Sequence, residues 1–364
     1  MPEHKGRVVV AMSGGVDSSV SAALLVEQGY EVMGIMLRLW SEPGHMNAGG
    51  RDNRCCTRDQ MLEAHFVAKK LGIPFEVLDV REVFKQRIVD PFIEGYSQGI
   101  TPNPCLACNR HIRFGFLLEQ ALARGADYLA TGHYARITRA ADGTYELRKG
   151  ADPLKDQSYV LSMLTQQQLR HALFPVGEYT KAQVREMAAS RGLRVATRHE
   201  SQDLCFVADG DYRRFLRTYA AEAFVPGPIA LHTGEVIGKH QGLADYTIGQ
   251  RKGLGIAWHK PLYVIAKDAA SNMLIVGPRE ELGCRCLVAE AMNWIAGAPP
   301  AEPLHAEVKI RYRARAVPAW VTPLGADRAE VTFAEPLPDV TPGQGAVIYD
   351  GDRVLGGGII AERC

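Results

Sequence analysis

The sequence SGGVDSS, at residues 13–19, is the strongest indication of how this chain folds. It joins a β-type run at residues 7–12 to a helical run at 17–28, after which Gly29 signals a stop. Glycine lets backbone N–H groups approach an anion, the helix start adds partial positive charge, and serine hydroxyls add donors. An ordinary glycine-rich turn has a similar composition. The position between strand and helix favours a pyrophosphate site.

Strand-like and helical segments alternate along the first half of the chain. The predicted strands are residues 7–12, 31–37, 75–80 and 127–131, and the predicted helices are 17–28, 59–71 and 110–124. This alternation predicts an α/β fold, a doubly wound parallel sheet with helices on both faces. Residues 41–58, which include Cys55 and Cys56, interrupt the alternation and are expected to form a long loop.

The second half of the chain changes character. Helical patterns dominate residues 165–220, and the Pro/Gly-rich stretch at 225–228 marks a boundary. Beyond it lie short β-type segments at 262–266, 272–276, 306–312, 329–333 and 345–349. They predict a small antiparallel β-barrel from about residue 285 to the end. A length of 364 residues fits two or three domains.

Composition excludes several classes of protein. With 46% hydrophobic and 23% charged residues, the chain is an ordinary globular one, neither disordered nor collagen-like. It lacks an 18-residue apolar run, so we expect no membrane span, and its first residues resemble no targeting signal, so we expect a cytoplasmic protein. The net charge of +1 means that a nucleic-acid surface must be a local patch. In the cytoplasm the eight cysteines should be mostly reduced.

A second motif, NPCLACN at residues 103–109, places Cys105 and Cys108 on a turn beside a helix start. Such a position favours the thiolate, the nucleophilic form of cysteine. Cys205 lies far downstream, in SQDLCF at 201–206. A zinc site is the alternative, but it needs a second CxxC-like pair, and the barrel offers only the CxC of residues 284–286. Unreactive packed thiols are the expectation for Cys284, Cys286 and Cys364.

Several short sequence motifs point to one family. The Walker A pattern is absent, and SGGVDSS resembles the PP-loop of the ATP pyrophosphatases. The other motifs are TGHYA (131–135), KDQSY (155–159), GKHQGLADYTIGQRKGLGIA (238–257) and VKIRYR (308–313). With two separated cysteines, the chain resembles the bacterial tRNA-specific 2-thiouridylases over nearly its whole length. Their architecture implies a PP-loop domain at 1–210, a small central domain at 211–284 and a tRNA-contacting barrel at 285–364.

The resemblance implies a reaction and its components. ATP, with Mg²⁺ near Asp17, would adenylate the 2-oxygen of the wobble uridine of tRNA (lysine, glutamate and glutamine acceptors), and a sulfur nucleophile would then displace AMP. Cys108 would be the nucleophile and Cys205 the persulfide carrier, supplied by a sulfur-relay protein or cysteine desulfurase. The implied ATP-binding residues are Ala11, Met12, Ser13, Gly14, Gly15, Val16, Asp17, Ser18, Leu37 and Gly132.

The resemblance also implies contacts with tRNA. Residues expected to line the target base are Asn103, Pro104 and Cys105, and those expected to contact tRNA elsewhere are His133, Lys155, Asp156, Gln157, Arg311, Tyr312 and Gln344. From the residues alone, His133 could equally be a buried histidine with satisfied hydrogen bonds, and Lys155 with Asp156 a solvated ion pair.

Cys105 departs from the common family pattern, in which many members carry Asp. A carboxylate could act as a base or orient the uracil, whereas a thiol does so poorly near neutral pH. The change provides three thiols, Cys105, Cys108 and Cys205, which could hold a 4Fe–4S cluster with one open iron that binds sulfide. A persulfide mechanism and a cluster mechanism are therefore both open.

A basic run near the C-terminus is independent of the family resemblance. Cations alternate with other residues along 308–316, at Lys309, Arg311, Arg313 and Arg315. If this run is a strand, its period of two places all four cations on one face. That face would bind tRNA phosphates, or it would be a solvated surface.

Two further functions are compatible with parts of the sequence. Another PP-loop enzyme that adenylates a small molecule would need neither a tRNA surface nor paired thiols. A non-catalytic RNA-binding protein with structural zinc would not need the intact PP-loop motif.

Overall fold

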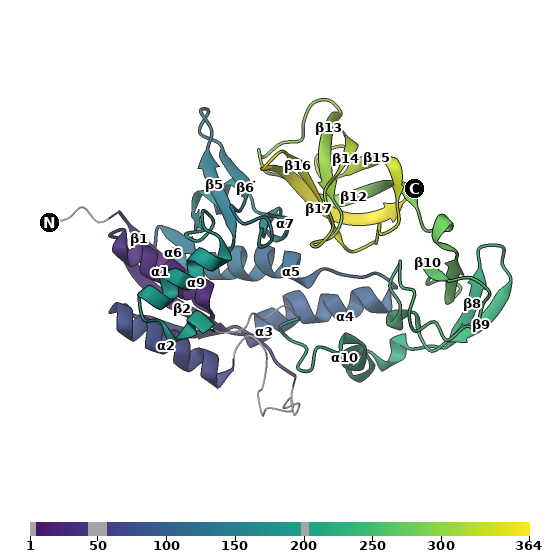
Figure 1. The fold of residues 1–364 in the computed structure, drawn as a ribbon, viewed down its shortest axis with the longest axis horizontal. Coiled ribbons are helices and arrows are strands. Elements are labelled where there is room, and N and C mark those ends of the chain that lie inside the picture. Colours follow the sequence, from purple (N-terminus) through teal and green to yellow (C-terminus); the bar gives the residue numbers. More distant parts are fainter. Residues whose placement is uncertain (1–4, 43–56, 198–203) are drawn as a thin grey trace.

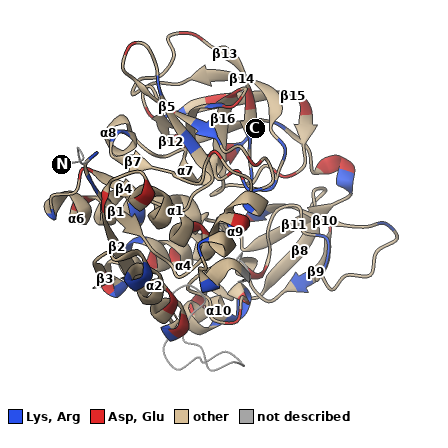
Figure 2. Cartoon of the chain, turned by 60° about the vertical axis from the view of Figure 1, so that its left-hand side comes forward, with Lys and Arg blue, Asp and Glu red and all other residues tan. Residues whose placement is uncertain are grey.

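The computed structural model describes residues 5–42, 57–197 and 204–364, which form three sheets (Figure 1). Cys55, Cys56 and most of the predicted loop at 41–58 lie outside the described residues. Within the described ranges, no helix combines the length and apolar character that a membrane crossing needs. Acidic and basic residues are interspersed over the helices, in keeping with the near-zero net charge (Figure 2).

The first sheet is parallel throughout, as predicted. It has the order β3-β2-β1-β4-β7, with strands β1 (Arg7–Ala11), β2 (Glu31–Arg38), β3 (Phe75–Asp79), β4 (Tyr128–Ala130) and β7 (Ala172–Leu173). Alternate residues of β1 face opposite sides, so that Val8 and Val10 join one buried cluster and Val9 joins another.

Helices cover both faces of this sheet. Helices α1 (Val16–Glu27), α2 (Arg58–Leu71) and α9 (Lys181–Ser190) contribute to the cluster of Val8 and Val10. On the other face lies a continuous helical stretch made of α5 (Pro104–Ala107), η2 (Cys108–Leu117) and α6 (Leu118–Ala123). The doubly wound architecture is therefore confirmed. The stretch begins earlier than the predicted residue 110, because Asn103 caps it.

A third group of helices forms an aromatic cluster beside the sheet. It contains α3 (Arg81–Phe84), η1 (Lys85–Val89), α4 (Asp90–Ser97) and α10 (Tyr212–Tyr219). We call "aromatic cluster" the buried group that includes Phe84, Phe92, Tyr96, Phe206 and Phe215. Its rings meet mostly edge to face, as Phe92 and Phe206 do at 5.2 Å between centroids.

The central segment has a sheet and a core of its own. The order is β10-β11-β8-β9, with strands β8 (Gly227–Leu231), β9 (Val236–His240), β10 (Tyr263–Asp268) and β11 (Met273–Gly277). Buried Ile229, Val264, Leu274 and Val276 form the centre of its core. The C-terminal segment adds β12 (Cys284–Trp294), β13 (Leu304–Lys309), β14 (Val317–Pro323), β15 (Ala329–Leu337), β16 (Gly345–Asp350) and β17 (Arg353–Arg363).

Strand β17 pairs with β12 as well as with β16, so these six antiparallel strands close into a barrel. This confirms the predicted C-terminal barrel. The predicted basic strand at 308–316 is wrong. Strand β13 ends at Lys309 and must pair with β14, Val308 lying opposite Val317, so residues 310–316 form the connection between them. The four cations therefore do not share one strand face.

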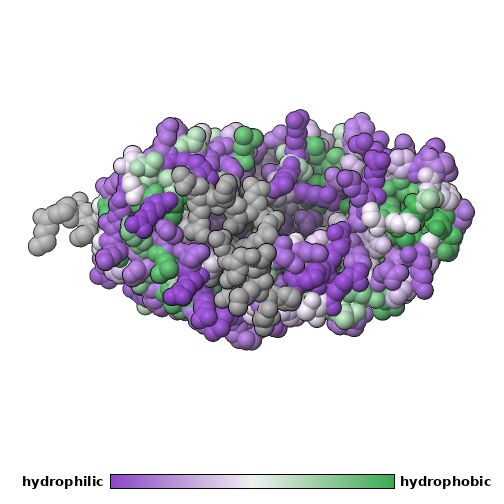
Figure 3. Space-filling view, turned by 60° about the horizontal axis from the view of Figure 1, so that its bottom comes forward, coloured by the Kyte–Doolittle hydropathy of each residue, from purple (hydrophilic) through white to green (hydrophobic). Residues whose placement is uncertain are grey.

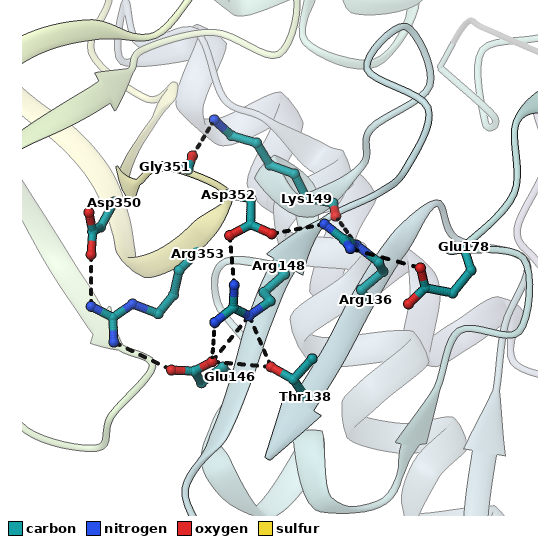
Figure 4. A network of polar contacts seen from close by, with 10 residues as sticks. All are labelled: Arg136, Thr138, Glu146, Arg148, Lys149, Glu178, Asp350, Gly351, Asp352 and Arg353. Carbon is teal, nitrogen blue, oxygen red and sulfur yellow. Dashed lines mark hydrogen bonds and ion pairs between the residues drawn. The ribbon is translucent and has the colours of Figure 1, made fainter. Parts of the chain in front are cut away.

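A hairpin from the first segment extends the barrel sheet. It consists of β5 (Ala135–Arg139) and β6 (Tyr145–Lys149), and Arg148 of β6 pairs with Arg353 of β17. The Asp352 carboxylate forms ion pairs with Arg148 at 2.7 Å and with Arg136 at 2.8 Å, within the network that Figure 4 shows. The barrel is thus joined to the PP-loop segment by backbone pairing and by a network of ion pairs.

The barrel seam also carries a disulfide. Cys286 and Cys364 exchange both backbone hydrogen bonds across β12 and the chain end, and their Cα atoms lie 5.0 Å apart. That spacing suits a disulfide, which the structure contains. The expectation of unreactive packed thiols is therefore wrong for this pair. Cys284 is buried, as that expectation requires.

Candidate active site

The loop at residues 13–15 connects β1 to α1 and leaves the first turn of α1 open to an anion. Gly14 has φ +70°, and a Cβ there would overlap the backbone carbonyl of Gln60. The Ser18 hydroxyl accepts from the backbone N–H of Ser13 at 3.2 Å, and the Ser19 hydroxyl donates to the Gly15 carbonyl at 2.8 Å. The serines thus hold the loop, and the N-terminal N–H groups of α1 point into it.

Gly132 lies against this loop from the end of β4. A Cβ at Gly132 would be 2.7 Å from the backbone N of Ser18 and 2.8 Å from the carbonyl carbon of Asp17. Only glycine fits that approach. Of the other predicted ATP residues, Met12 and Val16 are buried, Ala11 ends β1, and Leu37 lies on the neighbouring strand β2.

Asp17 is held by two residues that sequence reasoning missed. Lys181 Nζ lies 2.8 and 2.9 Å from its two carboxylate oxygens, and the Tyr134 hydroxyl donates to one of them at 2.7 Å. Lys181 is the first residue of α9, and its backbone N–H donates to Asp152 at 2.9 Å. The ammonium group therefore neutralises the one carboxylate in the first turn of α1.

The two predicted catalytic cysteines border the same buried cluster, although they lie far apart in the sequence. Cys108 and Cys205 are both half-buried and both pack against the aromatic cluster, as does Leu37 from β2. Cys105 is exposed, one helical turn from Cys108. Among the described residues, no group of three or more His, Cys, Asp or Glu side chains is arranged to hold a metal ion.

Asn103 fixes the start of the helix that carries Cys105 and Cys108. Its side-chain oxygen accepts from the backbone N–H groups of Cys105 at 3.2 Å and Leu106 at 3.3 Å. Asn109 donates to the Cys105 carbonyl at 3.1 Å. The predicted target-base residues thus form a capped helix start, with Pro104 as its first residue.

A loop of the barrel lies directly on the segment that precedes this helix start. Gln344 Nε2 donates to the Thr101 carbonyl at 2.8 Å, and the Thr101 N–H donates to the Pro342 carbonyl at 3.1 Å. The Tyr159 hydroxyl lies 3.1 Å from both the N–H and the carbonyl oxygen of Gly345. Gln344, predicted to contact tRNA, therefore anchors the barrel to the Asn103 segment in this structure.

Arg311 and Tyr312 also lie at this junction. Arg311 donates to the Thr341 hydroxyl at 2.5 Å and to the Ile248 carbonyl at 3.2 Å. The Tyr312 ring is 38% exposed and lies 6.1 Å from the ring of Tyr159. The barrel side of the predicted tRNA surface thus adjoins the predicted target-base segment.

Three more predicted tRNA residues, Lys155, Asp156 and Gln157, lie on the chain between β6 and α7 (Ser158–Leu161). Asp156 accepts from the backbone N–H groups of Gly150 and Ser158, at 3.0 and 3.1 Å. Gln157 accepts from the Tyr134 N–H at 3.1 Å, and Lys155 is half-buried. These contacts shape the segment beside the Asp17 partner Tyr134.

His133 is a buried residue with both ring nitrogens engaged. The residue is 6% exposed, with Nδ1 2.6 Å from the Thr131 hydroxyl and Nε2 3.2 Å from Arg113 Nη1. Because a guanidinium only donates, Nε2 accepts and the ring proton lies on Nδ1. Burial, together with the charge of Arg113, holds the His133 pKa well below its ordinary value. A direct contact between His133 and tRNA stays a prediction, and this geometry does not favour it.

The depressed pKa of His133 predicts a loss of stability in mild acid. The unfolded imidazole binds a proton near pH 6.5 and the folded one only at much lower pH. As pH falls, the unfolded state therefore binds a proton at this residue before the folded state does. Below pH 6.5 this lowers the free energy of unfolding by up to about 1.4 kcal/mol per pH unit. His133→Gln should flatten the fall in unfolding midpoint between pH 6.5 and 5. Parallel profiles for variant and wild type would contradict this.

Comparison with known proteins finds three family profiles in succession. They are described as a tRNA methyl transferase HUP domain over residues 6–209, a tRNA methyl transferase PRC-barrel domain over 213–278, and an aminomethyltransferase beta-barrel domain over 284–360.

Similar curated proteins span nearly the full chain. A tRNA-specific 2-thiouridylase MnmA from Magnetococcus marinus is 50% identical over 354 residues, covering 97% of this chain and 98% of its own length. The protein of the same name from Chloroflexus aggregans is 50% identical over 355 residues, covering 98% of each chain. The U34-tRNA thiolase NcsA from Methanococcus maripaludis, solved with a [4Fe-4S] cluster, aligns with 60% of this chain and 65% of its own. That match is 17% identical with a TM-score of 0.34, too weak to bear on function.

Proposed function

This chain belongs to the tRNA-specific 2-thiouridylase family, and we propose that it uses ATP to replace the 2-oxygen of the wobble uridine of tRNA by sulfur. It is a tRNA-modifying sulfurtransferase. One observation supports the proposal above the others. Leu37, beside the predicted ATP site, packs against the same aromatic cluster as Cys108 and Cys205. The proposed activating site and the proposed sulfur-carrying site therefore border one buried cluster.

The loop at 13–15 and the start of α1 fit the phosphates of ATP. Gly14 and Gly132 allow the backbone at Gln60 and at Ser18 to pack closely, which shapes the loop, and the helix start supplies N–H donors. We propose Asp17 as a ligand of Mg²⁺. The ion would offset the negative charge of the ATP phosphates when bound. When ATP binds, the Lys181 ammonium group would leave its ion pair with Asp17 and contact a phosphate oxygen instead, because it already borders the loop.

The chemistry requires activation because the uracil 2-oxygen is a poor leaving group. The oxygen attacks the α-phosphorus of ATP, the bond to the β-phosphate oxygen breaks, and pyrophosphate leaves. The terminal sulfur of a Cys205 persulfide then adds at C2, and the C2–O bond breaks as AMP leaves. The Cys108 thiolate attacks Sγ of Cys205, which releases 2-thiouridine and forms a Cys108–Cys205 disulfide. A thiol reductant reopens this disulfide, and a sulfur-relay protein or cysteine desulfurase restores the persulfide.

We place the target uridine at the helix start formed by Asn103, Pro104 and Cys105. The capped helix start is fixed on one side by Asn109 and on the other by the barrel loop that carries Gln344. Arg311 and Tyr312 border the same junction and would meet the tRNA there, with Lys155, Asp156 and Gln157 on the PP-loop side. The acceptors would be tRNAs for lysine, glutamate and glutamine. The proposed domains are 1–210, 211–284 and 285–364.

A cluster-based route is the alternative for sulfur delivery. Cys105 lies one turn from Cys108 and is exposed, which brings two thiols to one helix. In the described residues these two thiols and Cys205 do not form a group arranged to hold a metal ion, so this route requires Cys205 to move toward them. Anaerobic purification followed by iron and sulfide analysis separates the two routes. About four irons per chain would favour the cluster, and an iron-free protein that forms 2-thiouridine would favour the persulfide.

One assay tests the function itself. The protein is incubated with ATP, unmodified tRNA, a thiol reductant and a persulfide donor (a cysteine desulfurase with cysteine), with sulfide replacing the donor in a parallel reaction. 2-Thiouridine is measured by mass spectrometry of the digested tRNA. Formation that requires ATP supports the proposal. Pyrophosphate release without dependence on tRNA would instead indicate an enzyme for a small substrate, and tRNA binding without ATP use would indicate a non-catalytic RNA-binding protein.

A further inference from the structure

The central segment carries an ordered loop that the active site does not use. Residues 251–262 connect Gln250 to β10, and backbone hydrogen bonds close the base of the loop, from Gly249 to Val264 at 2.9 Å and from Val264 to Gln250 at 3.0 Å. Buried Leu254 and Leu262 fix the loop to the core beneath it. We call residues 251–262 the central loop. Its backbone is held in place although it contains no helix or strand.

The charge of the central loop is one-sided. Arg251, Lys252 and Lys260 are exposed, and residues 246–267 contain neither Asp nor Glu. None of these three cations forms an ion pair with a described residue, whereas the arginines in Figure 4 are paired with carboxylates. Exposed cations without carboxylate partners are available to an external anion.

The central loop also offers an aromatic ring and a concave surface. It lines a depression of about 530 Å³. Trp258 is 37% exposed and lies 5.2 Å from the ring of His259. Cations and an exposed aromatic ring around a depression suit a nucleic acid, because phosphates pair with the cations while a base or ribose packs on the ring.

The position of the loop indicates which part of a tRNA it could reach. Strands β8, β9 and β10 lie at the opposite end of the molecule from α1 and α2, with α5 between them (Figure 1). The target base is proposed to lie at the start of α5. An RNA segment at the central loop must therefore lie outside the base-binding site.

We propose that the central loop is a second tRNA-binding surface, which contacts phosphates of the tRNA body outside the anticodon stem–loop. The inference rests on the proposed function, since it names a further contact of the same substrate. A protein partner is the competing occupant of this end of the molecule, because Figure 3 shows an apolar surface there and Val225 and Val236 are 56% and 60% exposed. The unpaired cations favour RNA.

The test compares two RNAs and two variants. The triple variant Arg251→Gln/Lys252→Gln/Lys260→Gln is measured for binding to full-length unmodified tRNA and to its isolated anticodon stem–loop, across a salt series. Each lost phosphate contact reduces the slope of log K against log salt by about 0.7–0.9. We expect weaker binding and a slope smaller by about 2–3 for full-length tRNA, and no change for the stem–loop.

The control variant has the same change of net charge. Lys5, Lys69 and Arg170 are exposed on the PP-loop segment, and replacing all three by Gln should leave both slopes as in wild type. Trp258→Ala should weaken full-length tRNA binding without altering the salt slope, since it removes stacking and no charge.

Several results would overturn the inference. One is an unchanged affinity and slope of the triple variant for full-length tRNA. Another is an equal loss with the stem–loop, which would place the loop at the anticodon, and a third is a loss of sulfur transfer from a donor protein with normal tRNA binding. If wild-type protein bound no tRNA, the proposed function itself would fail, which is a different outcome.

Discussion

Cys205→Ser is expected to lose 2-thiouridine formation while tRNA-dependent pyrophosphate release continues. In the proposed mechanism, adenylation uses the loop at 13–15 and Asp17, whereas sulfur transfer needs the Cys205 thiol, which packs on the same aromatic cluster as Cys108. The loss should be roughly 10³-fold or more, as for removal of other catalytic nucleophiles. Mass spectrometry of digested tRNA measures the thiolated nucleoside, and a coupled assay measures pyrophosphate in the same reaction.

Cys108→Ser and Cys364→Ser complete this experiment. The first should lose turnover like Cys205→Ser. The second should keep thiolation, because Cys364 lies in the barrel disulfide with Cys286, and should lose only stability, by about 2–4 kcal/mol. A normal yield of 2-thiouridine from Cys205→Ser would contradict the two-thiol mechanism. Because a cluster also needs both residues, the iron analysis and not this experiment separates the two routes.

Features that depend on neighbouring residues could be predicted from the sequence. SGGVDSS lies between a strand and a helix, and Gly72 ends α2 with φ +67°, because glycine alone tolerates such conformations at no steric cost. The strand at β1 and the C-terminal antiparallel barrel follow from local pattern and turn residues in the same way, although β12, β14 and β17 are not predicted individually.

Features that depend on distant residues could not be predicted. Lys181 contacts Asp17 across 164 positions, and nothing near Lys181 distinguishes it from a solvated residue at a helix start. The cations of 309–315 show the period of a strand, yet the pairing of β13 with β14 requires the chain to reverse there. Gln344 could be placed on a turn, but its bond to Thr101 depends on how the barrel docks.

Asp17→Ala is expected to abolish adenylation and to leave tRNA binding largely intact. The side chain lies in the first turn of α1, beside the proposed phosphate cradle, whereas Arg311 and Gln344, which we propose to meet the tRNA, belong to the barrel. Pyrophosphate release should fall by about 10²–10³, the cost of removing one electrostatic group from a reacting centre. The tRNA dissociation constant, measured by filter binding, should stay within about twofold of wild type, less than 0.5 kcal/mol.

Two further variants distinguish a role in ATP binding from a role in folding. The Lys181 side chain is only 12% exposed, and Asp17→Ala removes the Asp17 carboxylate that pairs with its ammonium group. This variant therefore disturbs the local packing as well as the ATP site. Asp17→Asn keeps the shape and the hydrogen bond from Tyr134 but removes the charge, and it should lose pyrophosphate release to a similar extent. Tyr134→Phe removes one hydrogen bond and no charge, so it should reduce release much less. Pyrophosphate release at the wild-type rate from a folded Asp17→Asn protein would remove Asp17 from the ATP site, and with it the exchange proposed for Lys181.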